Sequence, residues 1–141
     1  MSETIPSIAG ILETSLYVGD LERSKRFYRT LFRFEVLGED DRLCALNVAG
    51  RQVLLLFKKE AARQPIVLPG GTIPGHDGRG QLHLAFAIAP SDRNGWENRL
   101  REANIPIEST VHWPRGGCSV YFRDPDNHLI ELAIPGIWSI Y

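Results

Sequence analysis

The sequence predicts an α+β fold built from two βαβββ units, and three observations lead to this prediction. Strand-like runs with alternating side chains dominate the chain, whereas only two segments have helical spacing. The same order of elements occurs twice, and residues 61–80, which are rich in proline and glycine, separate the two copies. An internal repeat constrains a fold more strongly than a single motif does.

The first copy covers about residues 11–60. Residues 12–18 form its first predicted strand, and a helix follows with Asp20 as its cap and Glu22 near its positive end. The helix is expected to end near Phe32. Three further predicted strands follow at residues 34–37, 43–48 and 53–57.

The second copy covers about residues 81–135. A predicted strand at residues 82–88 leads into a helix that is capped by Ser91 or Asp92 and stops at Asn104. Three more strands are predicted at residues 107–111, 119–122 and 129–134. At 141 residues, the chain is expected to form one domain, residues 1–141, that contains both copies.

The two copies can be laid over each other without gaps at their first and last strands. This overlay places Glu13 on His83 and Leu55 on Glu131. Strand side chains alternate between faces, and in the second copy the even positions are bulky and apolar. Glu13, His83 and Glu131 all occupy odd positions, so they share the face that is expected to line a concavity.

Glu131 stands between Ile130 and Leu132 in a strand that otherwise looks buried. Such a carboxylate either points at solvent or, if buried, needs a charged partner or a metal ion. A four-residue turn at 124–127 would place Glu131 opposite Val120, on the wrong face. An odd-length loop or a β-bulge would bring Glu131 opposite Tyr121, and the apolar pattern of Val120 and Phe122 favours the bulge.

Composition excludes several classes of protein. The net charge is −1 without a basic cluster, so no nucleic-acid partner is expected. The apolar runs are too short to span a bilayer, and no membrane partner is expected. Two cysteines and no signal peptide predict reduced thiols and a cytoplasmic location, with Cys118 in the core. His112 and His128 are interpreted as surface or turn residues.

Three segments resemble the vicinal oxygen chelate superfamily, which includes glyoxalase I, bleomycin- and fosfomycin-resistance proteins and extradiol dioxygenases. They read LETSLYVGDLERSKRFYRTLFRFEVL, QLHLAFAI and GGCSVYFRDPDNHLIELAIPG. The resemblance covers about residues 11–136, and its end is most similar to fosfomycin-resistance enzymes. It implies two βαβββ modules that form an incomplete barrel around one divalent metal ion. It also implies Glu13, His83 and Glu131 as the metal ligands.

Two positions depart from the pattern of the family. The first ligand is commonly His or Gln, whereas this chain has Glu13. Glyoxalase I typically has a fourth ligand, a Glu, where this chain has Leu55. Three protein ligands leave open positions, as a catalytic metal requires. Two carboxylates and one imidazole favour Mn²⁺, Fe²⁺, Ni²⁺ or Zn²⁺, and the sequence does not choose among them.

The sequence also predicts residues that contact a substrate. Arg115 lies in a glycine-rich turn that either binds an anion or is an ordinary hairpin turn. The resemblance adds Ser119 and Tyr121 as substrate contacts, and Glu131 and Tyr121 are the predicted catalytic residues. His76, in the 61–80 segment, is predicted to reach the pocket as an acid/base or as part of a lid.

These predictions together describe a metal-dependent enzyme that acts on a small oxygen-rich molecule as a lyase, isomerase or epoxide-opening catalyst. The alternatives are a metal-free protein that sequesters a drug or metabolite, and an extradiol-type dioxygenase. The open sheet edges predict a homodimer. Its metal sites lie within one chain or between two chains, and the resemblance favours the shared arrangement.

Overall fold

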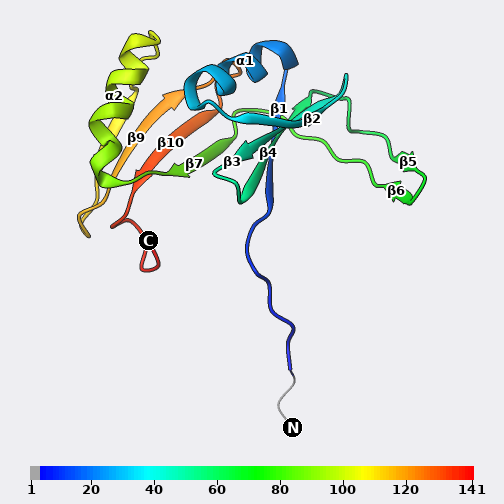
Figure 1. Ribbon diagram of the computed structural model, residues 1–141, viewed down its shortest axis with the longest axis horizontal. Coiled ribbons are helices and arrows are strands. Elements are labelled where there is room, and N and C mark those ends of the chain that lie inside the picture. Colours follow the sequence, from blue (N-terminus) through cyan, green and yellow to red (C-terminus); the bar gives the residue numbers. More distant parts are fainter. Residues whose placement is uncertain (1–3) are drawn as a thin grey trace.

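The computed structural model describes residues 4–141, which form two four-stranded sheets and two α-helices (Figure 1). The first module consists of β1 (Glu13–Val18), α1 (Leu21–Phe32), β2 (Glu35–Glu39), β3 (Leu43–Val48) and β4 (Gln52–Lys58). The second consists of β7 (His83–Ala87), α2 (Arg93–Glu102), β8 (Ser109–His112), β9 (Cys118–Arg123) and β10 (Leu129–Ile134). The predicted pair of βαβββ modules is therefore confirmed.

The two sheets have the same topology, with strand orders β1-β4-β3-β2 and β7-β10-β9-β8. In the first sheet Ser15 pairs with Leu55, and in the second Ala85 pairs with Glu131. These two pairs are related by the overlay of the two copies, so the overlay is in register. Leu55 therefore occupies the position in the first sheet that Glu131 occupies in the second.

The hydrophobic core lies on the even face of both sheets, beneath the helices. Its fully buried members come from both modules and are Leu16, Val18, Tyr28, Leu31, Cys44, Leu46, Leu54, Leu56, Leu100, Val120, Phe122, Ile130 and Leu132. Cys118 is also buried, as predicted. One continuous core therefore joins the modules and leaves the odd faces of both sheets free of packed helices.

Local hydrogen bonds fix both ends of α1. The Asp20 carboxylate accepts the Arg23 N–H at 3.0 Å, which confirms the predicted cap. The helix ends at Arg33, a left-handed residue whose N–H donates to the Arg29 carbonyl. The second helix differs from the prediction, because a 3₁₀ turn (Pro90–Asp92) precedes it and the Asp92 side chain makes no capping hydrogen bond.

Helix α1 lies over the junction of the modules (Figure 1), where buried polar groups link the two sheets. The Tyr28 hydroxyl donates to the Asp124 carboxylate at 2.7 Å. His128, interpreted as a surface or turn residue, lies in the β9–β10 connection but is fully buried. Its Nδ1 accepts the Leu82 N–H, so its Nε2–H donates to the Tyr17 carbonyl.

Replacing Tyr28 by phenylalanine should lower the free energy of unfolding at pH 7 by about 1–3 kcal/mol, because Asp124 loses a donor in a buried site. Burial and the nearby Asp124 charge raise the pKa of Tyr28 well above its usual value. A raised pKa gives stability that is complete below the unfolded-state pKa and is lost at higher pH. Urea unfolding at pH 7 and above pH 10 should show a smaller alkaline loss for Tyr28→Phe than for the wild type. Equal losses would contradict this assignment.

The β9–β10 connection differs from the predicted bulge. The pairing of the two strands is regular and places Glu131 opposite Tyr121, as the sequence predicts. The connection spans the five residues 124–128, an odd number that preserves the face of Glu131 without a bulge. Asn127 takes a left-handed conformation with φ 63°. The Asp124 carboxylate accepts the His128 N–H at 2.9 Å and closes the turn.

The segment at residues 61–80 is not structureless. It forms a short hairpin of β5 (Ile66–Leu68) and β6 (Gly71–Ile73) that extends away from both sheets (Figure 1). The base of the hairpin is closed by an ion pair between Arg63 and Asp77, with Nε and Oδ2 2.9 Å apart. The hydrogen bond from Arg63, followed by the N–H of Gly78, lowers the pKa of Asp77.

Strands β1 and β7 are equivalent edge strands of the two sheets, whose other edges are β2 and β8, and they do not pair with each other within residues 4–141. Residues 4–12 continue from β1 as an extended arm that leaves the body of the molecule (Figure 1). The arm exposes Ile5, Ile8 and Ile11, each more than three-quarters accessible. Over the same described residues, no helix combines the length and apolar character needed to cross a membrane.

Candidate metal centre

His83 and Glu131 meet on the odd face of the second sheet. His83 begins β7, and Glu131 lies in the adjacent parallel strand β10. The His83 Nε2 atom is 3.1 Å from Glu131 Oε1. The Glu131 side chain is only 9% exposed, whereas that of His83 is 51% exposed. The pair therefore presents an imidazole at the surface of a concavity and a carboxylate at its floor.

The second ring nitrogen of His83 determines what this pair can bind. Its Nδ1 lies 2.9 Å from the Leu129 carbonyl oxygen, which can only accept a hydrogen bond. Nδ1 therefore carries the proton, and in the neutral ring Nε2 directs a lone pair toward a carboxylate oxygen. Two acceptors at this distance require a proton or a cation between them. This arrangement, with a carbonyl that orients the histidine, fits a divalent metal ion.

The other carboxylate oxygen of Glu131, Oε2, accepts a hydrogen bond on the side away from His83. The Ser119 hydroxyl donates to Glu131 Oε2 at 2.6 Å. The Trp113 indole N–H in turn donates to Ser119 Oγ at 2.8 Å. Ser119 was predicted to contact a substrate. In this structure it is completely buried, and its hydroxyl orients Glu131. The sequence analysis missed Trp113, although its position just before the Ser119 strand is a usable signal.

Tyr121 completes this side of the concavity. It pairs with Glu131 across β9 and β10, and its ring centre lies 6.3 Å from that of His83. Burial, supported by the Glu131 charge and opposed by a hydrogen bond with Ser119, raises the pKa of the Tyr121 phenol. The phenol therefore stays protonated at neutral pH and can donate a hydrogen bond toward a bound molecule.

A cavity of about 510 Å³ opens beside this pair. Its lining is mostly apolar and consists of His83, Ala85, Ala87, Trp113, Tyr121, Glu131, Ala133, Ile137, Trp138, Ile140 and Tyr141. Residues 136–141 form one wall, which the sequence analysis did not anticipate. The apolar and aromatic composition of Ile137-Trp138-Ser139-Ile140-Tyr141 after the last strand is the signal that could have identified it.

The remaining predicted site residues lie elsewhere in the chain. Glu13 is exposed at the start of β1, in the other sheet. His76 lies on the odd face of the first sheet, where its Nδ1 is 2.7 Å from the Tyr17 hydroxyl and its ring meets Phe57 edge-on. Arg115 is exposed in its turn and does not line the cavity. Within residues 4–141, no three His, Cys, Asp or Glu side chains gather closely enough to hold a metal ion.

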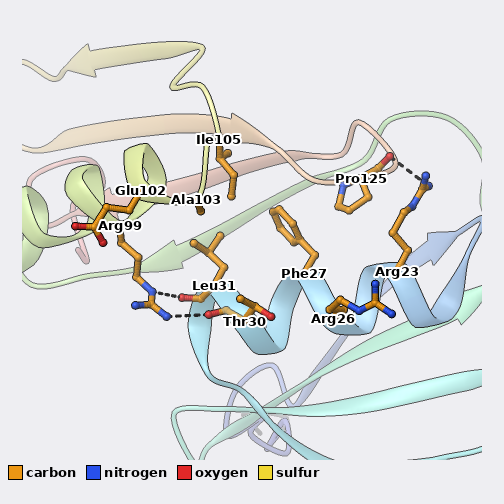
Figure 2. A pocket seen from close by; sticks show the side chains of 10 residues that line it. All are labelled: Arg23, Arg26, Phe27, Thr30, Leu31, Arg99, Glu102, Ala103, Ile105 and Pro125. Carbon is orange, nitrogen blue, oxygen red and sulfur yellow. Dashed lines mark hydrogen bonds between the residues drawn. The ribbon is translucent and has the colours of Figure 1, made fainter.

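A second groove lies between α1 and the C-terminal end of α2 (Figure 2). Phe27, Leu31 and Ile105 supply its apolar floor. Arg99 is engaged there, because its guanidinium donates to the carbonyls of Leu31 and Thr30 at 2.6 and 2.8 Å. A cation at the last carbonyls of a helix stabilises the helix end. Among the described residues that line this groove, Glu102 is the one carboxylate and no histidine or cysteine is present, so the groove offers no pair of metal ligands.

Two βαβββ modules with a buried carboxylate and an oriented imidazole on the concave face define a protein of the glyoxalase type. A sequence profile of the Glyoxalase/Bleomycin resistance protein/Dioxygenase superfamily matches residues 10–132. The chain belongs to this family, which is the vicinal oxygen chelate superfamily, and the resemblance noted from the sequence is confirmed.

Individual relatives carry different activities in their names. The chain is 28% identical to the metallothiol transferase FosB of Staphylococcus saprophyticus over 126 residues, covering 89% of this chain and 76% of the relative. It is 30% identical to a catechol-2,3-dioxygenase of Bacillus subtilis over 83% of this chain, but covers only 38% of that protein. The crystal structure of lactoylglutathione lyase from Agrobacterium tumefaciens superposes with a TM-score of 0.86 and 32% identity, covering 95% and 99% of the two chains.

Proposed function

We propose that the protein is a divalent-metal-dependent enzyme that acts on a small oxygen-rich molecule. The observation that carries this proposal is the pair of acceptor atoms, His83 Nε2 and Glu131 Oε1, held 3.1 Å apart in an orientation fixed from behind. Relatives named as a metallothiol transferase and a lactoylglutathione lyase support an enzyme. The donor set suits Mn²⁺, Fe²⁺, Ni²⁺ or Zn²⁺.

Glu13 is the third ligand in this proposal, and it comes from a second copy of the chain. Glu13 and His83 occupy equivalent positions on the free edges β1 and β7. If β1 of one copy pairs with β7 of the other while both odd faces point to the same side, the two strands must run antiparallel. This pairing can bring Glu13 beside His83. A homodimer formed in this way pairs the two edges where Glu13 meets His83 and completes the cup.

Exposed apolar side chains support the association of two copies. Besides the arm that precedes β1, the hairpin exposes Val67 to 81% and both Leu68 and Ile73 to nearly half. Large apolar side chains gathered on projecting segments are typical of surfaces that contact another protein. The arm precedes β1 in the chain, and the hairpin follows β4, the strand that pairs with β1.

The residues of the chain have distinct roles in this proposal. A divalent ion held by Glu13, His83 and Glu131 supplies Lewis acidity to neighbouring substrate oxygens. Ser119 keeps the Glu131 carboxylate in one orientation, and Tyr121 donates a proton or a hydrogen bond to the developing oxyanion. His76 and Tyr17, which are already hydrogen-bonded, form an acid/base pair on the opposite wall of the completed cup. The reaction is a lyase, isomerase or epoxide-opening reaction.

Leu55 gives a test of how the first sheet contributes to the site. Leu55→Glu should tighten metal binding by about 10-fold, because a carboxylate enters a coordination position that is otherwise open. Leu55→Ile is the matched control, since it keeps the volume of the side chain without an oxygen donor. Titration of the apoprotein of each variant with Zn²⁺ measures the effect. Equal affinities for the two variants would show that Leu55 does not face the metal ion.

Turnover measured before and after metal removal tests the proposed function. The protein is stripped with a chelator, reloaded with Mn²⁺, Fe²⁺, Ni²⁺ or Zn²⁺, and assayed for lyase, isomerase and epoxide-opening activity on a panel of small oxygen-rich compounds that includes fosfomycin, lactoylglutathione and compounds with uncharged aromatic bodies. At least one reloaded form should be active, and both the apoprotein and Glu131→Gln should be inactive. An apoprotein as active as the reloaded protein would overturn the proposal.

A further inference from the structure

We propose that residues 136–141 are the specificity wall of the site, and that they select a substrate with an uncharged aromatic or branched aliphatic body. The oxygen atoms of this substrate lie toward His83 and Glu131, and its apolar body lies against Ile137, Trp138 and Ile140. This inference rests on the proposed function and deepens it, because it assigns the substrate class of the same site.

The wall is a rigid loop. The main-chain oxygen of Tyr141 accepts the N–H groups of Gly136, Ile137 and Trp138 at 3.0–3.1 Å, which closes the segment on itself. The Tyr141 hydroxyl donates to the Ala133 carbonyl at 2.6 Å and so attaches the loop to β10. These bonds hold the segment beside the cavity without help from its apolar side chains.

Two glycines set the direction in which the loop leaves β10. Gly136 has φ 110°, a conformation that favours glycine. A Cβ atom on Gly136 would lie 2.4 Å from the nitrogen of Gly117, so the two backbones can approach only because both residues lack side chains. The approach turns the chain back over the odd face of the sheet, toward His83 and Glu131.

The loop exposes apolar side chains at the mouth of the cavity. Trp138 is 71% and Ile140 is 94% exposed, although the backbone at Trp138 and at Tyr141 is hydrogen-bonded. Ala85, Ala87 and Ala133 form a flat floor that leaves space above it. A cavity of this size with an apolar lining and a few convergent polar groups is typical of sites for small organic ligands.

The charges of the cup argue against a phosphonate or another compact anion. The cavity is lined by neither lysine nor arginine. On the first sheet, the odd positions of β1, β3 and β4 also carry no cation. Arg123 is the one cation at an odd position of β7, β9 or β10, and its Nε already donates to Glu108 at 2.8 Å. Apart from the proposed metal ion, a dianion would therefore find no unpaired lysine or arginine on these strands, whereas the apolar lining suits an uncharged body.

Matched chelators test the inference by direct binding. Acetohydroxamate and benzohydroxamate present the same pair of oxygens and differ in a methyl or a phenyl body. In calorimetric titrations of the Zn²⁺-loaded protein, benzohydroxamate should bind at least about 10-fold more tightly, because the phenyl ring covers apolar surface. Trp138→Ser combined with Ile140→Ser should reduce this ratio to below about 3-fold, with unchanged Zn²⁺ affinity. Leu37→Ser, which alters an exposed leucine on β2, is the control and should retain the ratio.

The possible outcomes separate this inference from the proposed function. A wild-type protein that binds none of Mn²⁺, Fe²⁺, Ni²⁺ and Zn²⁺ overturns the proposed function and the inference with it. A protein that binds Zn²⁺ but does not prefer benzohydroxamate, or that binds fosfomycin more tightly than benzohydroxamate, overturns the inference alone. Sedimentation of the double variant gives a further outcome. If the variant dissociates into monomers while the ratio is retained, the loop is a dimer contact and the inference is overturned.

Discussion

Replacing His83 by alanine is expected to abolish tight binding of divalent metal ions. Removal of an outer-shell partner of a metal ligand typically weakens affinity by about 10- to 100-fold, so loss of the ligand itself should cost at least about 100-fold. The structure strengthens this expectation, because His83 Nε2 lies 3.1 Å from Glu131 Oε1 while Nδ1 is held by the Leu129 carbonyl. A competition titration of the apoprotein against a chelator of known affinity measures the change.

His112→Ala is the matched control for this experiment. His112 is an exposed histidine at the end of β8, in the same sheet but outside the cavity. Its removal should leave metal affinity unchanged. If His83→Ala binds Zn²⁺ as tightly as His112→Ala, the pair formed by His83 and Glu131 is a structural ion pair and not a metal site.

Mixing two inactive variants is expected to restore metal sites. Glu13→Ala and His83→Ala should each bind metal poorly as pure homodimers. After they are unfolded together and refolded, each mixed dimer contains one site with both defects and one intact site. With random pairing, about half of the dimers are mixed, so about a quarter of the wild-type number of sites should return. Metal content after gel filtration measures this recovery.

The mixing experiment needs two controls, the variants refolded alone and purified mixed dimers. Each variant refolded alone should show no recovery. Mixed dimers are identified by a different affinity tag on each variant and are purified on both tags in sequence. Purified mixed dimers without metal binding would place Glu13 and His83 of one site in the same chain.

Much of the fold could be predicted because the internal repeat gives the order of the elements and the alternation of side chains gives the buried face of each strand. The even-position rule identified the core strands, and the overlay placed Leu55 and Glu131 at equivalent positions, which the two parallel pairings confirm. Asp20 was recognisable as a cap because its carboxylate acts on a neighbour three residues away. These features depend on local sequence or on its period, and both can be read without a structure.

The features that were missed depend on contacts between distant residues. The buried position of His128 is set by Tyr17 and Leu82, far away in the sequence. Ser119 appeared open to a ligand until its bonds to Glu131 and Trp113 were seen. The five-residue turn was mistaken for a bulge because the turn motif does not reveal which residue ends the loop.

Part of the candidate site could be predicted from the sequence, and part depends on contacts between distant residues. The structure brings His83 and Glu131 together as the odd-face rule predicts, because their strands are neighbours in one sheet. Glu13 stays in the other sheet, on a free edge. The equivalence of the two edges can be read from the repeat, but the pairing of one edge with another depends on association between modules, which strand periodicity does not encode.

Metal stoichiometry of the wild-type protein tests the central claim most directly. The protein is purified without chelators, analysed for Mn, Fe, Ni and Zn, and then stripped and titrated with each ion in turn. We expect binding to saturate at about one divalent ion per chain, since each site takes one Glu13, one His83 and one Glu131. Saturation below about 0.1 ion per chain with all four metals would contradict the existence of a metal centre at His83 and Glu131.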